Sequence, residues 1–422
     1  MKALIVCAHP EPRSFNGALR DLAAATQPLV LTALHQERAA GSVLDFEPFW
    51  ITNAVAVDAN AGAWSRILAL PGVGDVAENF DVEIREGQIA NGSIEGARSG
   101  GSPQLDGGIP TAHEDNLNCV NVQAAWNQGL TGAGRVVCHF DTGADGTHPA
   151  FASRWRGLDP GVPWNWAWRD PYDATQFPFD GGWHGTGTLS LMCGAPPDTT
   201  PIGVAYEAKW ISARTCCPPF NVQKVIDNYQ WAADPDSNLA TIDDVPDAIN
   251  NSWGTVQDCD QAFWNAIDVV EAAGIVNVIS VDNTGPSPAS VNTPESRATD
   301  VYRNFSVGNV DPHTAGYPIV SSSGRGPSPC DFFSIKPELT APGYLVRIAY
   351  PNSQYALGFG TSFAAPHVSG AVALLRQLNP DLTVNQIKEA LMVSAYDRGA
   401  TGEDNAYGWG ILDIGAYLHS AG

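Results

Sequence analysis

The chain has 422 residues, which is enough for two or three domains and a large buried core. Its 22 basic and 45 acidic residues give a net charge of −23, which argues against a nucleic acid or an anionic membrane surface as the partner. No apolar run is long enough to span a membrane, and eight cysteines in a chain of this length do not make a disulfide framework.

Residues 1–26 begin with a short apolar run, Ala3–Ala8, which His9 and Pro10 interrupt. The run is too short for a secretory signal. The segment is similar to the first strand and helix of flavodoxin-like quinone reductases, but the similarity ends there and leaves no room for a flavin domain. We therefore treat residues 1–26 as an atypical segment of fused or mis-assigned origin. A redox function is the weakest alternative, and absence of flavin absorbance would dismiss it.

Residues 27–85 have the pattern of a small α/β module. Helices are predicted over 29–40 and 64–70, and strands over 46–57 and 82–84. The pattern is generic, so an adaptor domain is the plain alternative. Residues 86–117 are rich in Gly, Ser and Asn, which is a linker composition.

A larger domain is predicted over 118–422, because buried strands and helices alternate there. This alternation predicts an α/β fold, with a mainly parallel sheet between helical layers. Polar groups in such sheets gather at the carboxyl ends of the strands. The strands are expected at 135–141, 248–251 and 275–281, and the helices at 120–128, 222–233, 261–273 and 383–395.

Three short motifs in this domain carry the chemistry. Asp141 ends a strand in Phe140-Asp141-Thr142-Gly143, and His184 opens a helix in His184-Gly185-Thr186-Gly187. Ser362 is expected in the first turn of a helix, in Gly360-Thr361-Ser362-Phe363-Ala364, with its hydroxyl facing outward. Each motif is weak alone. Together they have the order Asp, His, Ser, which is the order in subtilisin.

With these motifs, residues from about 118 to about 416 resemble the subtilisin-like serine proteases, and within them the bacillopeptidase F-like members. The resemblance implies a three-layer subtilisin-like fold, protein or peptide substrates, and no required cofactor. It also implies that 27–85 is an inhibitory propeptide-like module and that the precursor cuts itself within 86–117. A monomeric, secreted or extracellular enzyme is expected.

The expected reaction is peptide hydrolysis through an acyl-enzyme on Ser362. His184 acts as the general base, and Asp141 fixes its tautomer. The side chain of Asn283 is expected to join the backbone N–H of Ser362 in the oxyanion hole, with a turn-forming role as the plain alternative. By resemblance, Ser252-Trp253-Gly254 forms the strand that binds substrate backbone.

Two positions depart from the family pattern. Val281-Asp282 stands where Ala-Gly usually precedes the oxyanion asparagine, and by resemblance this position lines the primary specificity pocket. We therefore predict that Asp282 favours Lys or Arg before the scissile bond. Gly187 replaces a supporting histidine, which puts stability in doubt. These departures motivate the competing hypothesis, a non-catalytic subtilisin fold that binds peptides.

No cysteine spacing resembles a zinc site, and no metal is assigned. Asp-rich loops at 170–180 and 234–247 leave a structural calcium ion as an alternative to solvated carboxylates. Cys138 and Cys193 are expected to be buried free thiols. The loop cysteines can pair in ways that the sequence does not distinguish; they are Cys216, Cys217, Cys259 and Cys330.

Overall fold

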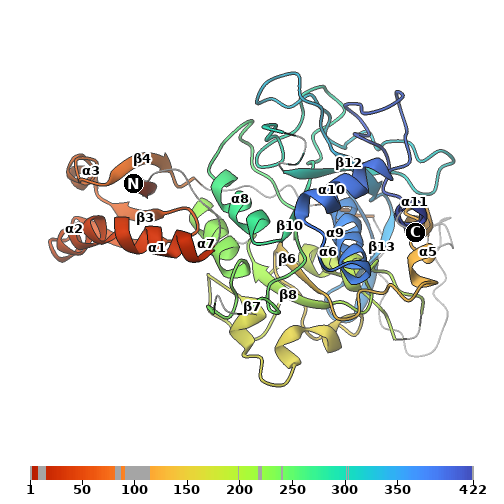
Figure 1. Ribbon diagram of the computed structural model, residues 1–422, viewed down its shortest axis with the longest axis horizontal. Helices are drawn as coiled ribbons and strands as arrows, with labels where there is room; N and C mark the ends of the chain where they lie inside the picture. The colour runs from red at the N-terminus through yellow and green to blue at the C-terminus, as the bar shows by residue number, and fades with distance from the viewer. Residues whose placement is uncertain are drawn as a thin grey trace.

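The computed structural model describes residues 2–7, 16–80, 87–90, 115–197, 199–216, 221–238, 241–300, 302 and 304–420. These residues form a small N-terminal module, residues 2–80, beside a larger body, residues 115–420 (Figure 1). None of the described helices is long and apolar enough to cross a membrane.

The N-terminal module is an antiparallel four-stranded sheet in the order β2-β3-β1-β4, covered by helices. The strands are β1 (Lys2–Cys7), β2 (Val43–Phe49), β3 (Ala54–Ala59) and β4 (Val73–Glu78), and the helices are α1 (Asn16–Thr26), α2 (Pro28–Ala39) and α3 (Ala61–Ile67). Val30 and Leu34 of α2 pack with Val55 and Val57 of β3 in a buried apolar cluster. This cluster gives the module a core of its own.

The boundary predicted at residue 26 is wrong as a structural boundary. Strand β1 pairs with β3 on one side and with β4 on the other, so residues 2–7 are part of the module's sheet. The single strand predicted over 46–57 is also wrong, because β2 ends at Phe49 and Asn53 turns the chain with a φ of 47°. The strand predicted over 82–84 lies outside the described residues.

The body is built on a seven-stranded sheet in the order β12-β11-β10-β9-β6-β8-β7. Every pair in this sheet is parallel, and its strands are largely buried, as expected for a sheet with helices on both faces. The strands are β6 (Val136–Asp141), β7 (Trp168–Arg169), β8 (Lys209–Arg214), β9 (Ala248–Asn251), β10 (Val276–Ser280), β11 (Phe305–Val310) and β12 (Leu339–Pro342).

Helices α7 (Val222–Ala232) and α8 (Trp264–Ala272) lie on one side of this sheet, and α6 (His184–Cys193) and α9 (Thr361–Leu378) lie on the other (Figure 1). Thr383 and Gln386 cap α10 (Val384–Val393) reciprocally. The helix predicted over 120–128 is wrong in its extent, because only Gln123–Trp126 is helical within that range. The remaining helices are α4 (Asp115–Cys119), α5 (Gln123–Trp126), α10 (Val384–Val393), α11 (Ile414–Ser420) and the 3₁₀ turns Ala152–Arg154, Arg156–Leu158 and Trp164–Trp166.

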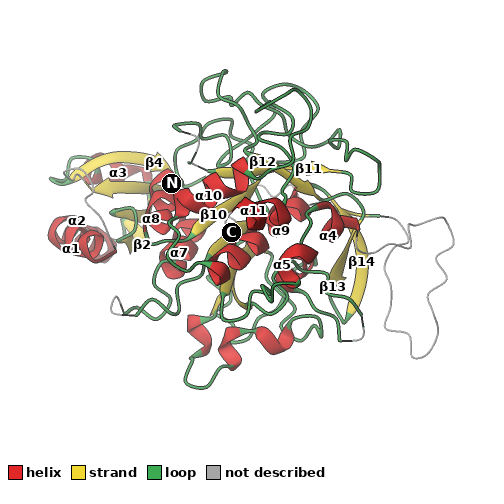
Figure 2. Cartoon of the chain, turned by 45° about the vertical axis from the view of Figure 1, so that its right-hand side comes forward, coloured by secondary structure: helices red, strands yellow, loops and turns green. Residues whose placement is uncertain are grey.

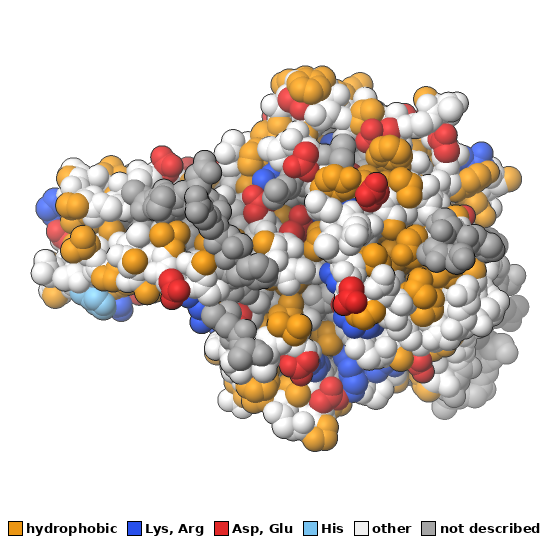
Figure 3. All heavy atoms as spheres, in the orientation of Figure 1, with side chains coloured by type: hydrophobic (Ala, Val, Ile, Leu, Met, Phe, Trp, Pro, Cys, Tyr) orange, Lys and Arg blue, Asp and Glu red, His pale blue; other side chains and the backbone are white. Residues whose placement is uncertain are grey.

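The N-terminal module docks on α7. Gln223 at the start of α7 exchanges hydrogen bonds with the side chain of Asn79, and its own side chain donates to Glu47. Near the end of the helix, the side chain of Gln230 accepts from the backbone of Trp50 at 2.8 Å. The module stands out from the body, and acidic side chains are scattered over the face shown in Figure 3.

A third sheet joins segments that are far apart in the sequence. Strand β14 (Gln354–Phe359) forms a hairpin with β13 (Val346–Tyr350) and also pairs antiparallel with β5 (Gln88–Ile89) (Figure 2 shows β13 and β14). Because β14 ends just before α9, this pairing brings residues 87–90 to the start of the helix that carries Ser362.

Candidate active site

The structure brings Asp141 and His184 into direct contact. Asp141 is the last residue of β6, and His184 is the first residue of α6. Nδ1 of His184 lies 2.8 Å from Oδ1 of Asp141, and both side chains are fully buried. A carboxylate at this distance holds the proton on Nδ1 and leaves Nε2 as the basic nitrogen.

Neighbouring groups hold the carboxylate of Asp141 in its charged form. The Thr142 amide donates to Oδ1 at 2.8 Å, and the Thr188 hydroxyl donates to Oδ2 at 3.1 Å. Burial raises the pKa of Asp141, but the charge and hydrogen bond of His184 and the nearby imidazole of His139, 3.7 Å away, outweigh burial and hold the pKa well below its usual value. Asp141 is therefore ionised beside the imidazolium that forms when His184 takes up a proton.

His139 and Thr188 were missed from the sequence. Nε2 of His139 lies 2.7 Å from the Thr188 hydroxyl, which in turn contacts Asp141. His139 could have been predicted as a neighbour of Asp141, because it lies two residues earlier on the same strand and therefore on the same face of the sheet. Thr188 lies one helical turn after His184 on α6, which is also a predictable spacing.

Ser362 lies in the first turn of α9, as predicted. Its Oγ lies 3.4 Å from the backbone oxygen of Ser252, and the Ser252 hydroxyl donates to the backbone oxygen of Ser362 at 2.8 Å. Ser362 is only 1 % exposed, so the outward-facing hydroxyl that the sequence predicted is wrong for this form of the chain. Residues 87–90 lie beside His184 and the strand that precedes Ser362.

Asn283 lies beside the start of α9. Its Oδ1 accepts hydrogen bonds from the backbone amide of Thr361 at 2.9 Å and from the Thr361 hydroxyl at 3.2 Å. These two bonds fix which end of the amide is oxygen, so Nδ2 is the end that can donate to an anion. A role of Asn283 in the oxyanion hole remains a prediction.

The residues predicted to bind substrate have different environments. Ser252 contacts Ser362 as described, whereas Trp253 packs its indole against Phe263. Val281 is fully buried, and its amide donates to Val307 in the sheet, so its backbone belongs to the core. A substrate contact of Val281 remains a prediction.

Asp282 adopts a left-handed conformation with a φ of 73°. Its Oδ1 accepts from the backbone amide of Asn283 at 2.5 Å, and its Oδ2 accepts from the side chain of Asn292 at 2.6 Å. Both carboxylate oxygens are thus engaged in shaping the turn that presents Asn283. A role in specificity remains a prediction.

Gly87 contacts His184. The backbone N–H of Gly87 donates to Nε2 of His184 over 3.2 Å. The pairs Gly358–Ile89 and Phe359–Gln88 hold the following residues as a strand against β14. The segment predicted as a linker, residues 86–117, therefore contacts His184 through Gly87, its first described residue.

Three carboxylates have metal-ligand spacing among the described residues. One oxygen from each of Asp234, Asp236 and Asp244 lies within 4.8 Å of the others. Asp234 is also paired with Arg20 of the N-terminal module. Of the cysteines, Cys259 and Cys330 form a disulfide, and Cys138 and Cys193 are buried free thiols as predicted.

A family model described as the subtilase family matches residues 132–410, which contain Asp141, His184, Asn283 and Ser362. The chain belongs to the subtilase family. This subtilase is 29 % identical over 413 aligned residues to bacillopeptidase F of Bacillus subtilis (strain 168), covering 94 % of this chain and 28 % of that protein. It is also 29 % identical over 308 residues to subtilisin BL of Lederbergia lenta, covering 71 % and 96 %.

A solved structure supports the fold. Fervidolysin from Fervidobacterium pennivorans, described as a keratinolytic enzyme related to subtilisin, matches with a TM-score of 0.71 at 20 % identity over 99 % of this chain and 60 % of that one. The predicted α/β subtilisin-like fold is thereby confirmed. The subtilase spans about a quarter of the length of bacillopeptidase F and well over half that of fervidolysin.

Proposed function

We propose that this subtilase is a serine endopeptidase that is made as a precursor and cuts its own chain between Glu86 and Gly87. The observation that carries the proposal is the hydrogen bond from the Gly87 amide to Nε2 of His184. A general acid that releases a leaving amine must reach the amide nitrogen of the scissile bond. Gly87 N is that nitrogen for the bond that follows Glu86.

In the proposed reaction, the Ser362 hydroxyl attacks the carbonyl carbon of the scissile bond and passes its proton to Nε2 of His184. The imidazolium then gives this proton to the leaving amine, and an acyl ester remains on Ser362. Water attacks the ester by the same route, which releases the acid and restores the serine. The buried carboxylate of Asp141 stabilises the imidazolium during both steps.

The oxyanion that forms on the attacked carbonyl needs donors near the start of α9. The Ser362 amide belongs to the first turn of this helix and has no helical acceptor, and Nδ2 of Asn283 is held on the same side by the bonds to Thr361. We assign the oxyanion hole to these two donors. Their preorganisation supplies stabilisation without rearrangement when the charge appears.

The N-terminal module is proposed to inhibit the enzyme until it is removed. Its contacts with Gln223 and Gln230 hold it on α7, while residues 87–90 lie in the active site. Tethering the cleavage site to a docked module makes self-cleavage effectively unimolecular. Such a substrate needs little side-chain recognition, so Glu86 at the junction does not decide the enzyme's preference toward other proteins.

The test compares the wild-type chain with Ser362→Ala, using a serine-directed fluorophosphonate probe, casein cleavage and amino-terminal sequencing. We expect the wild type to label, to cleave casein and to start at Gly87, and S362A to lose all three while it remains full length. Ser369→Ala, a buried hydroxyl on the same helix, is the matched control and should label like the wild type.

If the wild type neither labels nor cleaves, even after residues 1–117 are removed, the enzyme proposal fails. A peptide-binding subtilisin fold is then the function to pursue. A mature chain that starts far from Gly87 would leave the endopeptidase proposal intact but would refute the cleavage site assigned between Glu86 and Gly87.

A structural calcium ion, which the sequence left open, is proposed at Asp234, Asp236 and Asp244. Hard cations prefer such oxygen ligands, and Oδ1 of Asp244 is buried without a hydrogen-bond partner among the described residues. We expect calcium to raise the melting temperature of S362A and to do so less in the D236N derivative. An equal shift in both proteins would argue against this site.

We also propose that the enzyme is monomeric and acts outside the cell. The Cys259–Cys330 disulfide supports an oxidising compartment, because such bonds are rare in reducing cytosol. One relative, from Bacillus subtilis, is named minor extracellular protease Epr. Recovery of the active protein from culture medium, and light scattering at the mass of one chain, would test both statements.

A further inference from the structure

Glu295 is a fully buried carboxylate that the reaction does not use. Its side chain is 0 % exposed, and neither Oε1 nor Oε2 has a hydrogen-bond partner among the described residues. Burial raises the pKa of Glu295 well above its usual range, and the charge of Asp282 raises it further. The backbone amides of Glu295 and Asn292 and the charge of Lys336 only partly offset these effects.

The carboxylate points at the predicted substrate-binding strand. A Cβ placed on Gly254 would lie 3.0 Å from Oε1 and 3.5 Å from Oε2 of Glu295. Gly254 lies two residues after Ser252, whose backbone oxygen accepts from Ser362. Glu295 therefore lies beside a glycine that comes two residues after Ser252, the residue whose backbone oxygen contacts Ser362.

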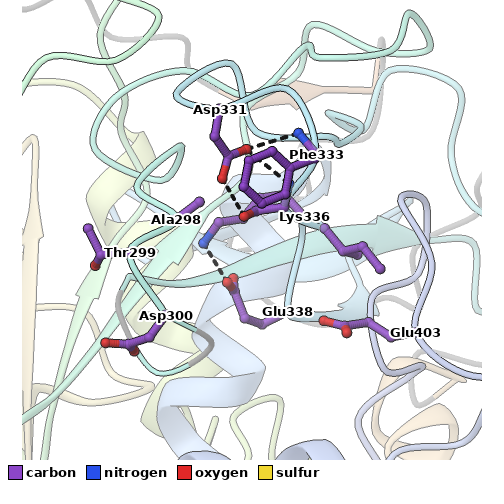
Figure 4. A pocket seen from close by; sticks show the side chains of 10 residues that line it. Ala298, Thr299, Asp300, Asp331, Phe333, Lys336, Glu338 and Glu403 are labelled. Carbon is purple, nitrogen blue, oxygen red and sulfur yellow. Dashed lines mark hydrogen bonds and ion pairs between the residues drawn. The ribbon is translucent and has the colours of Figure 1, made fainter.

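Among the described residues, no basic side chain hydrogen-bonds to the carboxylate of Glu295. Lys336 is the cation whose charge acts on it, but the Lys336 ammonium is bonded to Glu338 and to the backbone oxygen of Asn304 (Figure 4 shows Lys336 and Glu338). Asp282 adds a second negative charge nearby, and its carboxylate accepts hydrogen bonds from Asn283 and Asn292. In the described part of the chain, Glu295 and Asp282 therefore lie near each other without a basic side chain bonded to Glu295.

A peptide substrate can supply that charge. A substrate that adds as a strand beside Ser252–Gly254 places a residue opposite Gly254, and paired residues on neighbouring strands point to the same face. A long basic side chain at that position reaches past the glycine toward Glu295. A guanidinium there would favour the ionised form of Glu295 and would form charge-assisted hydrogen bonds with it.

We propose that Glu295, together with the charge of Asp282, selects substrates with Arg or Lys beside the scissile bond, and that Glu295 is the group that contacts the basic side chain. The proposal rests on the endopeptidase function above and names its substrate class. It also changes the prediction from the sequence, because Asp282 becomes a supporting charge whose hydrogen bonds shape the turn.

The experiment uses the self-processed enzyme and two peptide substrates that differ only in the residue before the scissile bond. One carries Arg and the other citrulline, which has the same shape without the charge. We expect kcat/KM to favour Arg in the wild type, and Glu295→Gln to lower the Arg-to-citrulline ratio by about 10²-fold, the usual effect of removing one partner of a buried ion pair.

Asp258→Asn is the matched control. Asp258 is exposed on the loop after the substrate-binding strand, so the variant removes a nearby negative charge without touching the pocket. Its ratio should equal that of the wild type. A fall in D258N as large as in E295Q would assign the preference to long-range charge and overturn the proposal.

Fluorophosphonate labelling of each protein separates the possible failures. A wild type that labels but does not favour Arg over citrulline overturns the role of Glu295 and leaves the endopeptidase intact. A wild type that does not label refutes both. If E295Q itself does not label, the ratio is measured in Glu295→Asp, which withdraws the carboxylate by one methylene; an unchanged ratio there overturns the proposal.

Discussion

Replacing Gly87 by Ala should slow self-cleavage without impairing the mature enzyme. A Cβ on Gly87 would lie 2.5 Å from Cε2 of Phe363 and 3.2 Å from the backbone oxygen of Phe359. Carbon atoms in contact lie about 3.5–4.0 Å apart, so the methyl group needs roughly 1 Å more room. Phe363 is fully buried and packs on His184 at 5.6 Å between ring centres, which leaves the segment at 87–90 as the part that must move.

A displacement of about 1 Å at the reacting atoms can cost about 10²-fold in rate. We therefore expect G87A to process itself about 100 times more slowly than the wild type, because the displacement moves the backbone nitrogen of residue 87 away from Nε2 of His184. After cleavage, residue 87 is the free amino terminus of the mature enzyme and no longer has to lie in the active site. The mature enzyme's kcat/KM on a peptide substrate should therefore be unchanged. Gel time courses of purified precursor, with amino-terminal sequencing of the product, measure the processing rate.

Gly62→Ala is the matched control, since a Cβ there meets one atom, Oδ1 of Asn60, at an ordinary 3.5 Å. It lies in α3 of the same module, and we expect wild-type processing. If G87A were processed at the wild-type rate and still started at residue 87, the close contact with Phe363 would not describe the reacting precursor. The assignment of Gly87 to the leaving amine would then be refuted.

Other predictions concern single groups. Asn283→Ala should lower kcat by about 10²–10³-fold with KM little changed, the effect established for the oxyanion-hole asparagine of subtilisin. The double variant Cys259→Ser/Cys330→Ser should lose about 4 kcal/mol of the free energy of unfolding in urea, because the disulfide spans 71 residues; a loss under 1 kcal/mol would contradict this. Burial lowers the pKa of His367 to about 4, so the unfolded chain binds a proton first and stability should fall by about 3 kcal/mol between pH 6.5 and 4. In S362A protein, His367→Gln should remove that slope, and a slope that persisted would assign it to other groups.

The place of each predicted site residue in the fold could be predicted from the sequence, because each motif is local. Asp141 ends a strand, His184 opens a helix and Ser362 lies in a first helical turn, and each feature can be read from a few neighbouring residues. A parallel sheet then gathers strand ends and helix starts at one edge, so chain order and fold class together predict one site.

Features that depend on distant pairings could not be predicted. Nothing local indicates that residues 88 and 89 pair with Phe359 and Gly358, which are some 270 positions away. The loop cysteines allowed several pairings, and only the fold brings Cys259 to Cys330. Glu295 was overlooked for the same reason, since its importance comes from Gly254, a neighbour in space rather than in sequence.

Two contacts of different extent fit the proposal that one precursor is both the substrate and the inhibitor of the enzyme. Beyond Gly87, the active site holds a strand of two residues, Gln88–Ile89, and the Ala90 amide, which donates to Leu357 at 2.9 Å. So short a strand is marginal once the covalent bond to the module is cut, so the new amino terminus can leave. The module itself stays bound through its contacts along α7, among them the hydrogen bonds of Gln223 and Gln230. Self-cleavage should therefore precede release of the inhibitor, and activity should appear later than the new amino terminus.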